Sequence, residues 1–391
     1  MMRFFDAHCD TIGLILEAGA DFLAEPGKGG DAGASGGGGD MAAHGARSAK
    51  SSPIPQVTLP GLKAGGIGAQ VFASWVWSGK YKGREFEAGM AKVDAVRALC
   101  AAYPDDLALA ATGADLAAPF AAAGGAAGCV VGAAGDGRGR IAILPSLESA
   151  DPLVGDVDNL FAFYEAGIRL LTLAWGDNAI CGSAYGNGTG LTKKGADLVA
   201  ACESLGVMVD VSHLSDRGFA DLCQVAESPF VASHSNCRSL CPSDRNLTDE
   251  MIKALAERGG VMGITLAPGF LSAEYLKKEQ SATGRSFQAV LSGEETYESA
   301  QVHGADAMAA VPRPPLSTVV DHVKLAINKG GEDSVGLGGD LDGVDYLPAG
   351  FEGAANYPRI EELLREGGLT PRQIDKVCHE NFLRVFQEIL G

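Results

Sequence analysis

Short apolar runs alternate with amphipathic segments along most of the chain. After a first run that begins at Phe4, the apolar runs cover Ile67–Trp75, Leu107–Ala111, Arg140–Leu147, Ile168–Trp175, Val207–Val211, Phe230–Ser233, Gly260–Leu266 and Ser334–Gly339. Helical periodicity covers Thr11–Ala20, Glu85–Tyr103, Asp156–Ala166, Thr192–Leu205, Asp216–Ala226, Thr248–Arg258, Leu316–Lys329, Pro358–Glu366 and Pro371–Leu390. Strands that are apolar throughout are buried on both faces, as in parallel sheets. The alternation therefore predicts an α/β protein.

Eight or nine such strands favour a (β/α)8 barrel with insertions, formed by residues 1–391 as a single domain. A doubly wound open sheet is the alternative. No G-x-G-x-x-G motif follows the first strand, which weakens the dinucleotide-binding form of that fold.

Two segments interrupt the alternation. Residues 26–52 are rich in glycine and have no periodicity, which is typical of a flexible surface insertion. Residues 269–314 are long, polar and moderately charged, and loops of this length are usually functional or disordered. On a barrel, this second segment would lie at the catalytic face.

Composition and charge narrow the function further. A net charge of −18 argues against nucleic acid and anionic membrane surfaces as partners, because both attract basic patches. No apolar run approaches the roughly 20 residues of a membrane span, and the first residues do not read as a signal peptide. We therefore expect no membrane association and a cytoplasmic location. Nine cysteines without a C-x-x-C pair are typical of reduced thiols, and Cys237 with Cys241 is a weak zinc candidate.

Polar residues with metal-binding chemistry come at the carboxyl ends of the apolar runs. They are His8, Asp10, Glu148, His213, His234 and Asp340. Singly, such a histidine is more often structural and such an aspartate more often a helix cap. Together they match nitrogen and oxygen ligation of one or two divalent metal ions, at the end of a barrel where catalytic residues lie. His303, His322 and His379 do not fit this pattern and are predicted to be structural, and His44 is predicted to be solvated.

Several short motifs occur in a specific order along nearly the whole chain. They are Asp6-Ala7-His8-Cys9-Asp10, Leu59-Pro60-Gly61-Leu62 with Gly65-Gly66, Glu148, Asp210-Val211-Ser212-His213, Ser233-His234-Ser235-Asn236, Asp244-Arg245-Asn246-Leu247, Gly338-Gly339-Asp340-Leu341-Asp342-Gly343 and Asn381-Phe382-Leu383-Arg384. This ordered set resembles the renal (membrane) dipeptidases, which are binuclear zinc peptidases of the amidohydrolase superfamily.

The resemblance implies a role for each matching residue. His8 and Asp10 would bind one zinc ion, His213 and His234 the other, and Glu148 would bridge both, giving two zinc ions per chain. Arg245 would bind the C-terminal carboxylate of a dipeptide, because a guanidinium fork suits that group.

The same resemblance implies a mechanism. A hydroxide that bridges the two metals would attack the scissile carbonyl, and Asp340 would bind substrate and transfer the proton to the leaving amine. The family also tends to dimerise, so a homodimer is compatible with the resemblance.

One position departs from the family pattern. The family often has a histidine that assists the oxyanion where this chain has Trp175, and an indole N–H donates but does not act as an acid or base. The oxyanion role would pass to Trp175, to Asn178 or to metal alone, or Trp175 is simply a packing aromatic. The alternatives to a dipeptidase are an amidohydrolase of another carboxylate-bearing amide, such as an N-acyl amino acid, and a non-catalytic, metal-stabilised ligand-binding barrel.

The first motif also carries a prediction about side-chain direction. Residues two apart in a strand share a face. His8 and Asp10 should therefore point together and hold metal, and Cys9 should point the other way into the barrel packing. Asp6 should share the side of His8 and is a candidate to support a metal ligand through a hydrogen bond.

Overall fold

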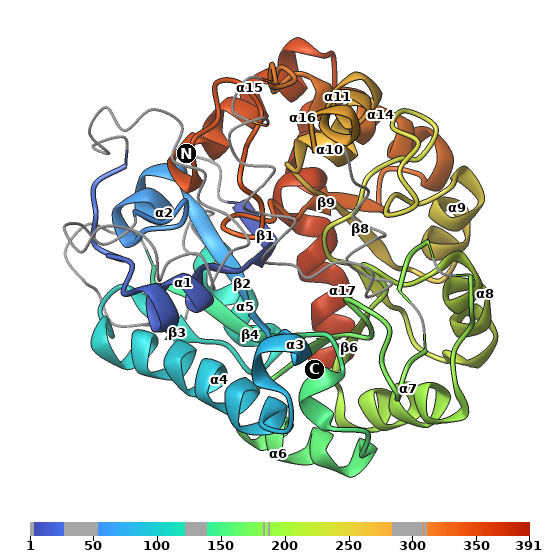
Figure 1. Cartoon of the computed structure of the whole chain (residues 1–391). Helices are drawn as coiled ribbons and strands as arrows, with labels where there is room; N and C mark the ends of the chain where they lie inside the picture. The colour runs from blue at the N-terminus through green and yellow to red at the C-terminus, as the bar shows by residue number, and fades with distance from the viewer. Residues whose placement is uncertain are drawn as a thin grey trace.

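The computed structural model describes residues 4–26, 54–121, 139–182, 184–186, 188–283, 308 and 311–391. In these residues one nine-stranded sheet has the order β2-β1-β9-β8-β7-β6-β5-β4-β3, and its pairings are parallel. An additional β2–β4 pairing closes eight of the strands into a barrel, with helices around it (Figure 1). The predicted (β/α)8 barrel is confirmed, and the open-sheet alternative is wrong.

The strands are β1 (Phe4–Cys9), β2 (Ile67–Trp75), β3 (Leu107–Leu109), β4 (Ile141–Glu148), β5 (Leu170–Thr172), β6 (Met208–Asp210), β7 (Val231–Ala232), β8 (Val261–Ile264) and β9 (Val335–Leu337). The predicted span of β2 is confirmed at both ends. The predicted strand Ile168–Trp175 is longer than β5, because the chain leaves the ladder after Thr172. β3 pairs with the first half of β4, on the edge where β5 pairs with the second half.

The α-helices are α1 (Thr11–Ala18), α2 (Leu59–Gly65), α3 (Ser78–Tyr81), α4 (Glu85–Ala102), α5 (Gly113–Ala121), α6 (Leu160–Glu165), α7 (Lys193–Leu205), α8 (Asp216–Val225), α9 (Asp249–Glu257), α10 (Pro268–Leu271), α11 (Ala273–Thr283), α14 (Thr318–Gly330), α15 (Tyr357–Glu366), α16 (Pro371–Asp375) and α17 (Asn381–Leu390). Several begin at a hydroxyl cap: the side chain of Thr248, for example, accepts a hydrogen bond from the Met251 amide. A single C-terminal helix was predicted, but a π-helical turn at Lys376–Glu380 separates α16 from α17.

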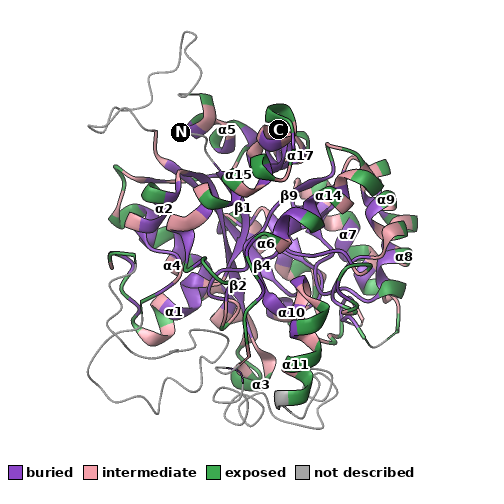
Figure 2. Ribbon diagram, turned by 90° about the horizontal axis from the view of Figure 1, so that it is seen from above, coloured by how far each residue is buried: buried purple, intermediate pink, exposed green. Residues whose placement is uncertain are grey.

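Helix α17 closes the amino-terminal end of the barrel. Phe5 of β1 stacks on Phe382 and Phe386 of α17, with ring centroids 5.4 Å apart in each pair. The other interior side chains in this layer include Ala7, Ala69, Val71, Leu144, Leu170, Met208, Val231 and Val261. Figure 2 shows the buried strands at the centre of the molecule, inside partly exposed helices. Because apolar side chains fill this end, polar chemistry is confined to the carboxyl ends of the strands.

Both predicted interruptions fall partly outside the described residues. Of the glycine-rich segment 26–52, only Pro26 is described. The start of the predicted loop 269–314 is instead helical, in α10 and α11, whereas 284–307 lie outside the described residues, as do His44 and His303.

Other expectations concern membranes and thiols. In the described residues, no helix is both long and apolar enough to cross a membrane. Cys237 and Cys241 are buried thiols whose sulfurs face the carbonyl oxygens of His322 and Gly269. His322 is buried between the Cys237 amide and the Leu271 carbonyl, in a structural position as predicted.

Candidate metal centre

The end of β1 brings His8 and Asp10 to the open end of the barrel. Phe5 and Ala7 point into the barrel and Cys9 packs outward in the main core, as predicted for Cys9. The β1–β2 register shifts between Asp6 and Cys9, so Asp6 does not share the face of His8. The prediction that Asp6 points with His8 and Asp10 is therefore wrong. Asp6 instead accepts hydrogen bonds from the Gln70 side chain (2.9 Å) and the Gly339 amide (2.6 Å).

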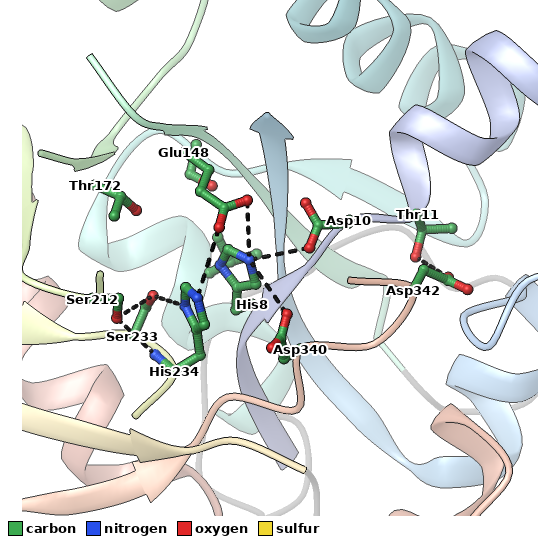
Figure 3. Close-up of polar contacts among 12 residues, drawn as sticks. His8, Asp10, Thr11, Glu148, Thr172, Ser212, Ser233, His234, Asp340 and Asp342 are labelled. Atoms are coloured by element: carbon green, nitrogen blue, oxygen red, sulfur yellow. Dashed lines mark hydrogen bonds and ion pairs between the residues drawn. The ribbon is translucent and has the colours of Figure 1, made fainter. Parts of the chain in front are cut away.

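Three carboxylates surround the His8 imidazole (Figure 3). His8 Nε2 lies 3.3 Å from Asp10 Oδ2, 3.6 Å from Glu148 Oε2 and 4.0 Å from Asp340 Oδ1. Asp10 precedes α1, yet its side chain makes no capping hydrogen bond. The common role of an aspartate as a helix cap therefore does not explain this residue.

Glu148, at the end of β4, connects this group to the two other histidines. Its Oε1 lies 3.1 Å from His213 Nε2 and 3.8 Å from His234 Nε2. The two Nε2 atoms are 2.8 Å apart, and the His234 ring stacks on that of His8 with centroids 3.7 Å apart. All six residues predicted from the strand ends therefore converge on one buried cluster, with Glu148 at its centre.

A chain of hydrogen bonds fixes the orientation of His234. The Ser233 hydroxyl donates to Asp210 Oδ2 (2.6 Å), and its oxygen lies 2.8 Å from His234 Nδ1. Because the Ser233 proton is used on Asp210, this pattern assigns the His234 proton to Nδ1 and leaves the Nε2 lone pair facing the centre. Asp210 also accepts a hydrogen bond from Thr172 (2.6 Å).

The Ser233 contact leads to an expected result. Ser233→Ala removes the acceptor that holds His234 Nδ1–H, so the chain should bind Zn²⁺ about 10- to 100-fold more weakly in chelator competition. Ser334→Ala is the matched control, because its buried hydroxyl bonds Gly331 at the opposite end of the barrel. Equal Zn²⁺ affinity in both variants would contradict the assignment.

The pKa values of the three histidines shift in different directions. Burial lowers the pKa of His213 and His234 well below the usual value, with the positive charges of Arg245 and His8 acting in the same direction. Burial also disfavours the His8 cation, but the negative charges of Glu148 and Asp10 outweigh it and raise the pKa of His8 well above its usual value. His213 and His234 are therefore neutral bases at neutral pH.

The carboxylates of the centre hold protons more tightly than usual. Burial, followed by the charge of Asp10, raises the pKa of Glu148 to about 8. Burial raises the pKa of Asp340 to about 7, although the His8 charge opposes this. Several buried anions in one place favour either protonation or a bound cation.

The cluster passes a direct test as a metal site. Two sets of ligand atoms lie mutually within 4.8 Å, one from His8, Glu148 and His234 and one from His8, Asp10 and Asp340. Among the described residues, His8 Nδ1 and Nε2 and His213 Nδ1 are buried without a hydrogen-bond partner. Buried polar atoms are nearly always satisfied, and neutral imidazole with carboxylate oxygen is a donor set suited to zinc. These residues fit a metal.

Arg245 lies beside the cluster and is only 3% exposed. It donates from Nη1 to the Ser235 hydroxyl (2.7 Å) and from Nη2 to the His234 carbonyl (2.6 Å). Its buried Nε has no hydrogen-bond partner in the described part of the chain. The guanidinium thus supports the His234 backbone and retains a donor.

The two candidates for an oxyanion role occupy different environments. The Trp175 ring lies 4.8 Å from Trp75 and 6.2 Å from His213, at the edge of the cluster. Asn178 accepts from the amides of Ile180 and Cys181 and donates to the Leu173 carbonyl. The turn thus uses the Asn178 oxygen and one of the two hydrogens of its NH₂ group.

Backbone conformation was not predictable at this centre. His213, Asp340 and Asp342 have φ values of 68°, 59° and 65°. Left-handed backbone is uncommon outside glycine and clusters at functional sites. At Asp340 and Asp342 it follows β9 directly, and the turn there, which ends at Gly343, brings Asp340 toward His8.

Comparison with known proteins gives a consistent family. The family model described as membrane dipeptidase (peptidase family M19) matches residues 2–390. An uncharacterised protein in the pqqA 5′ region of Klebsiella pneumoniae is 32% identical over 257 residues, which are 64% of this chain and 82% of that protein. Dipeptidase 3 of Mus musculus is 27% identical over 343 residues, 85% of this chain; the chain spans only 58% of that relative's length.

Solved structures share the fold. A structure described as the dipeptidase AC, a metallopeptidase, has a TM-score of 0.75 at 24% identity, covering 100% of this chain and 99% of that one. A metallopeptidase from Rhodobacter sphaeroides, liganded with a phosphinate mimic of the dipeptide L-Ala-D-Ala, has a TM-score of 0.73 at 22% identity, with the same coverage.

Proposed function

The chain belongs to the membrane dipeptidase family, peptidase family M19, and from that membership we propose that it is a zinc-dependent dipeptidase with two zinc ions per chain. The observation that carries the proposal is the convergence of three histidines and three carboxylates around Glu148. Family membership supports dipeptide hydrolysis over both alternatives, the N-acyl amino acid amidohydrolase and the non-catalytic barrel.

The proposed ligands divide into two sets that share Glu148. His8 and Asp10 would hold one zinc ion, and His213 and His234 the other. His8 lies 3.3 Å from Asp10, and His213 lies 3.1 Å from Glu148 and 2.8 Å from His234, which supports this division. Bound zinc would activate a water molecule and polarise the scissile carbonyl.

Asp340 is the proposed proton carrier. Its Oδ1 lies 4.0 Å from His8 Nε2, beside the proposed zinc ligands, where a carboxylate can take a proton from the attacking water and later give it back. The carboxylate would accept the proton of the attacking water at an Oδ atom and donate it to the leaving amine.

Arg245 and Trp175 are the proposed substrate-binding residues. The unpaired Arg245 Nε, buried beside the cluster, supports binding of the substrate's C-terminal carboxylate. Trp175 would contact the substrate with its ring face or its indole N–H, on the side where the ring approaches His213. Asn178 stays the second candidate for this role, because its NH₂ group donates one hydrogen to the Leu173 carbonyl and has a second.

The proposal is tested by metal content and substrate range. Protein loaded with zinc and then desalted should contain about two zinc ions per chain and hydrolyse some members of a panel of dipeptides with L- and D-residues at the C-terminus. Zinc well below one per chain, or hydrolysis of N-acyl amino acids without hydrolysis of dipeptides, would overturn it.

Arg245→Ala tests how the substrate is held. We expect KM to rise at least tenfold for a cleaved dipeptide and to change little for its C-terminal amide, since only the free carboxylate pairs with the guanidinium. Arg245→Lys keeps the charge but not the fork and should recover part of the loss. An equal rise for both substrates would mean that Arg245 acts only through its bond to the His234 carbonyl.

The cytoplasmic location, the homodimer and the single-domain organisation stay predictions.

A further inference from the structure

We propose that Asp342 is a positioning residue for the part of the metal centre formed by His8, Asp10 and Asp340. The inference rests on the proposed function, because it concerns how well that centre holds zinc. In the described part of the chain, Asp342 makes no hydrogen bond or ion pair with His8, and it acts through the two segments that carry Asp10 and Asp340.

The Asp342 carboxylate joins three parts of the chain. Its Oδ2 accepts hydrogen bonds from the Thr11 hydroxyl (2.6 Å) and the Val57 amide (3.2 Å), and its Oδ1 accepts one from the Gln56 amide (2.7 Å). Figure 3 shows the Thr11–Asp342 pair beside Asp10, on the opposite side from His234. Asp342 is 4% exposed, so these bonds take the place of most contacts with water.

A second set of bonds makes the contact with Gln56 reciprocal. The Asp342 amide donates to Gln56 Oε1 (2.7 Å), and Gln56 Nε2 donates to the Val344 carbonyl (3.1 Å). Gln56 therefore holds the chain on both sides of Gly343. Gln56 and Val57 follow closely after the predicted insertion 26–52, so this region of the chain is tied to the β9 loop.

The same segments carry two of the proposed metal-binding carboxylates. Thr11 directly follows Asp10, and the Asp10 amide donates to the Leu341 carbonyl (2.9 Å). The Asp340 amide donates to the His8 carbonyl (3.1 Å). Asp342 thus fastens the loop after β9 to the loop after β1 immediately beyond the point where both deliver their ligands.

The chemistry of Asp342 indicates more than a fold contact. Its hydrogen-bond partners are neutral groups, and burying a carboxylate among neutral donors is less favourable than burying an amide. Its backbone is also left-handed, at φ 65°, where asparagine or glycine is at least as well suited. The three donors around the side chain account for an aspartate at this position. A carboxylate can accept all three hydrogen bonds, whereas the oxygen of an asparagine has two lone pairs and its NH₂ group accepts none.

Two variants test the inference on zinc binding rather than on turnover. Asp342→Asn keeps the shape and removes the charge and one acceptor, and Thr11→Val keeps the shape and removes one donor. Chelator competition should show one of the zinc dissociation constants weakened 10- to 100-fold in Asp342→Asn, and weakened by a smaller factor in Thr11→Val. The effects of the two substitutions should not add fully in the double variant, because they share the hydrogen bond between Thr11 and Asp342.

Asn381→Ala is the control for loss of stability alone. The Asn381 side chain donates to the carbonyls of Glu332 and Val335, at the opposite end of β9, so this variant should lower Tm and leave zinc binding unchanged. The inference is overturned if Asp342→Asn and Thr11→Val lower Tm in the same way and bind zinc like the wild type. If Asp342→Asn does not fold, unchanged zinc binding by Thr11→Val alone overturns it. Wild-type protein that takes up no zinc would overturn the proposed function as well, which separates the two failures.

Discussion

Glu148→Gln is expected to lower kcat/KM for a dipeptide by about a thousandfold or more, and to reduce the zinc content below two per chain. Glu148 is the residue that approaches all three histidines, through Oε2 to His8 and through Oε1 to His213 and His234. A carboxamide keeps the shape but offers one acceptor, and it turns an NH₂ group toward one half of the centre. Both proposed zinc positions should therefore weaken together.

The Tm of metal-free Glu148→Gln distinguishes the loss of zinc and activity from unfolding of the variant. Burial raises the pKa of the Glu148 carboxyl to about 8, so its anion is disfavoured in the metal-free protein. Glutamine carries no charge to bury, and the metal-free variant should have a Tm equal to or above that of the chelator-treated wild type. A variant that keeps two zinc ions and wild-type kcat/KM would show that Glu148 does not bridge the metals.

The barrel was predictable because its strands are apolar on both faces. β2 matches the predicted run from Ile67 to Trp75 because each of its nine residues is buried. The short strands were overestimated, because the chain around β5 stays buried after it has left the ladder. The hydrophobic pattern indicates which residues are buried. The ends of a strand depend instead on which backbone groups form hydrogen bonds with the neighbouring strand.

The ligand set was predictable for a related reason. In a parallel barrel all strands point the same way, so polar residues that follow apolar runs meet at one end. His8, Glu148 and His234 were found in this manner. The direction of Asp6 was not, because a register shift in β1 breaks the period-two rule that the prediction assumed.

The residues that support the ligands could not be assigned from the sequence. Asp210 and Ser233 lie in motifs that were noted, but the bond from Ser233 to His234 Nδ1 depends on the register of β6 and β7. The bonds between Gln56 and Asp342 join residues 286 positions apart, and neither residue has a local signal for that contact. Such contacts depend on tertiary packing, to which local patterns are insensitive.

Gly343→Ala is expected to remove zinc from the His8 side of the centre while the barrel stays folded. A methyl group on Gly343 would overlap Asp10 Oδ2 and Asp340 Oδ1. The Gly343 backbone is not left-handed, so alanine adds no backbone strain of its own. The overlap requires the two carboxylates or the loop after β9 to move, and displacement of ligands by about 1 Å is enough to lower activity by about a hundredfold.

The measurements are zinc content, kcat/KM and the Tm of the metal-free protein. Gly190→Ala is a matched control, because its methyl group would displace the Asp221 carboxylate, which pairs with Arg217 on α8 and lies outside the proposed centre. We expect Gly190→Ala to retain two zinc ions and Gly343→Ala to lose the one near Asp10, with a Tm close to that of the metal-free wild type. Retention of both zinc ions and full activity in Gly343→Ala would mean that Asp10 and Asp340 can move without loss, and that the close approach of the β9 loop does not set their position.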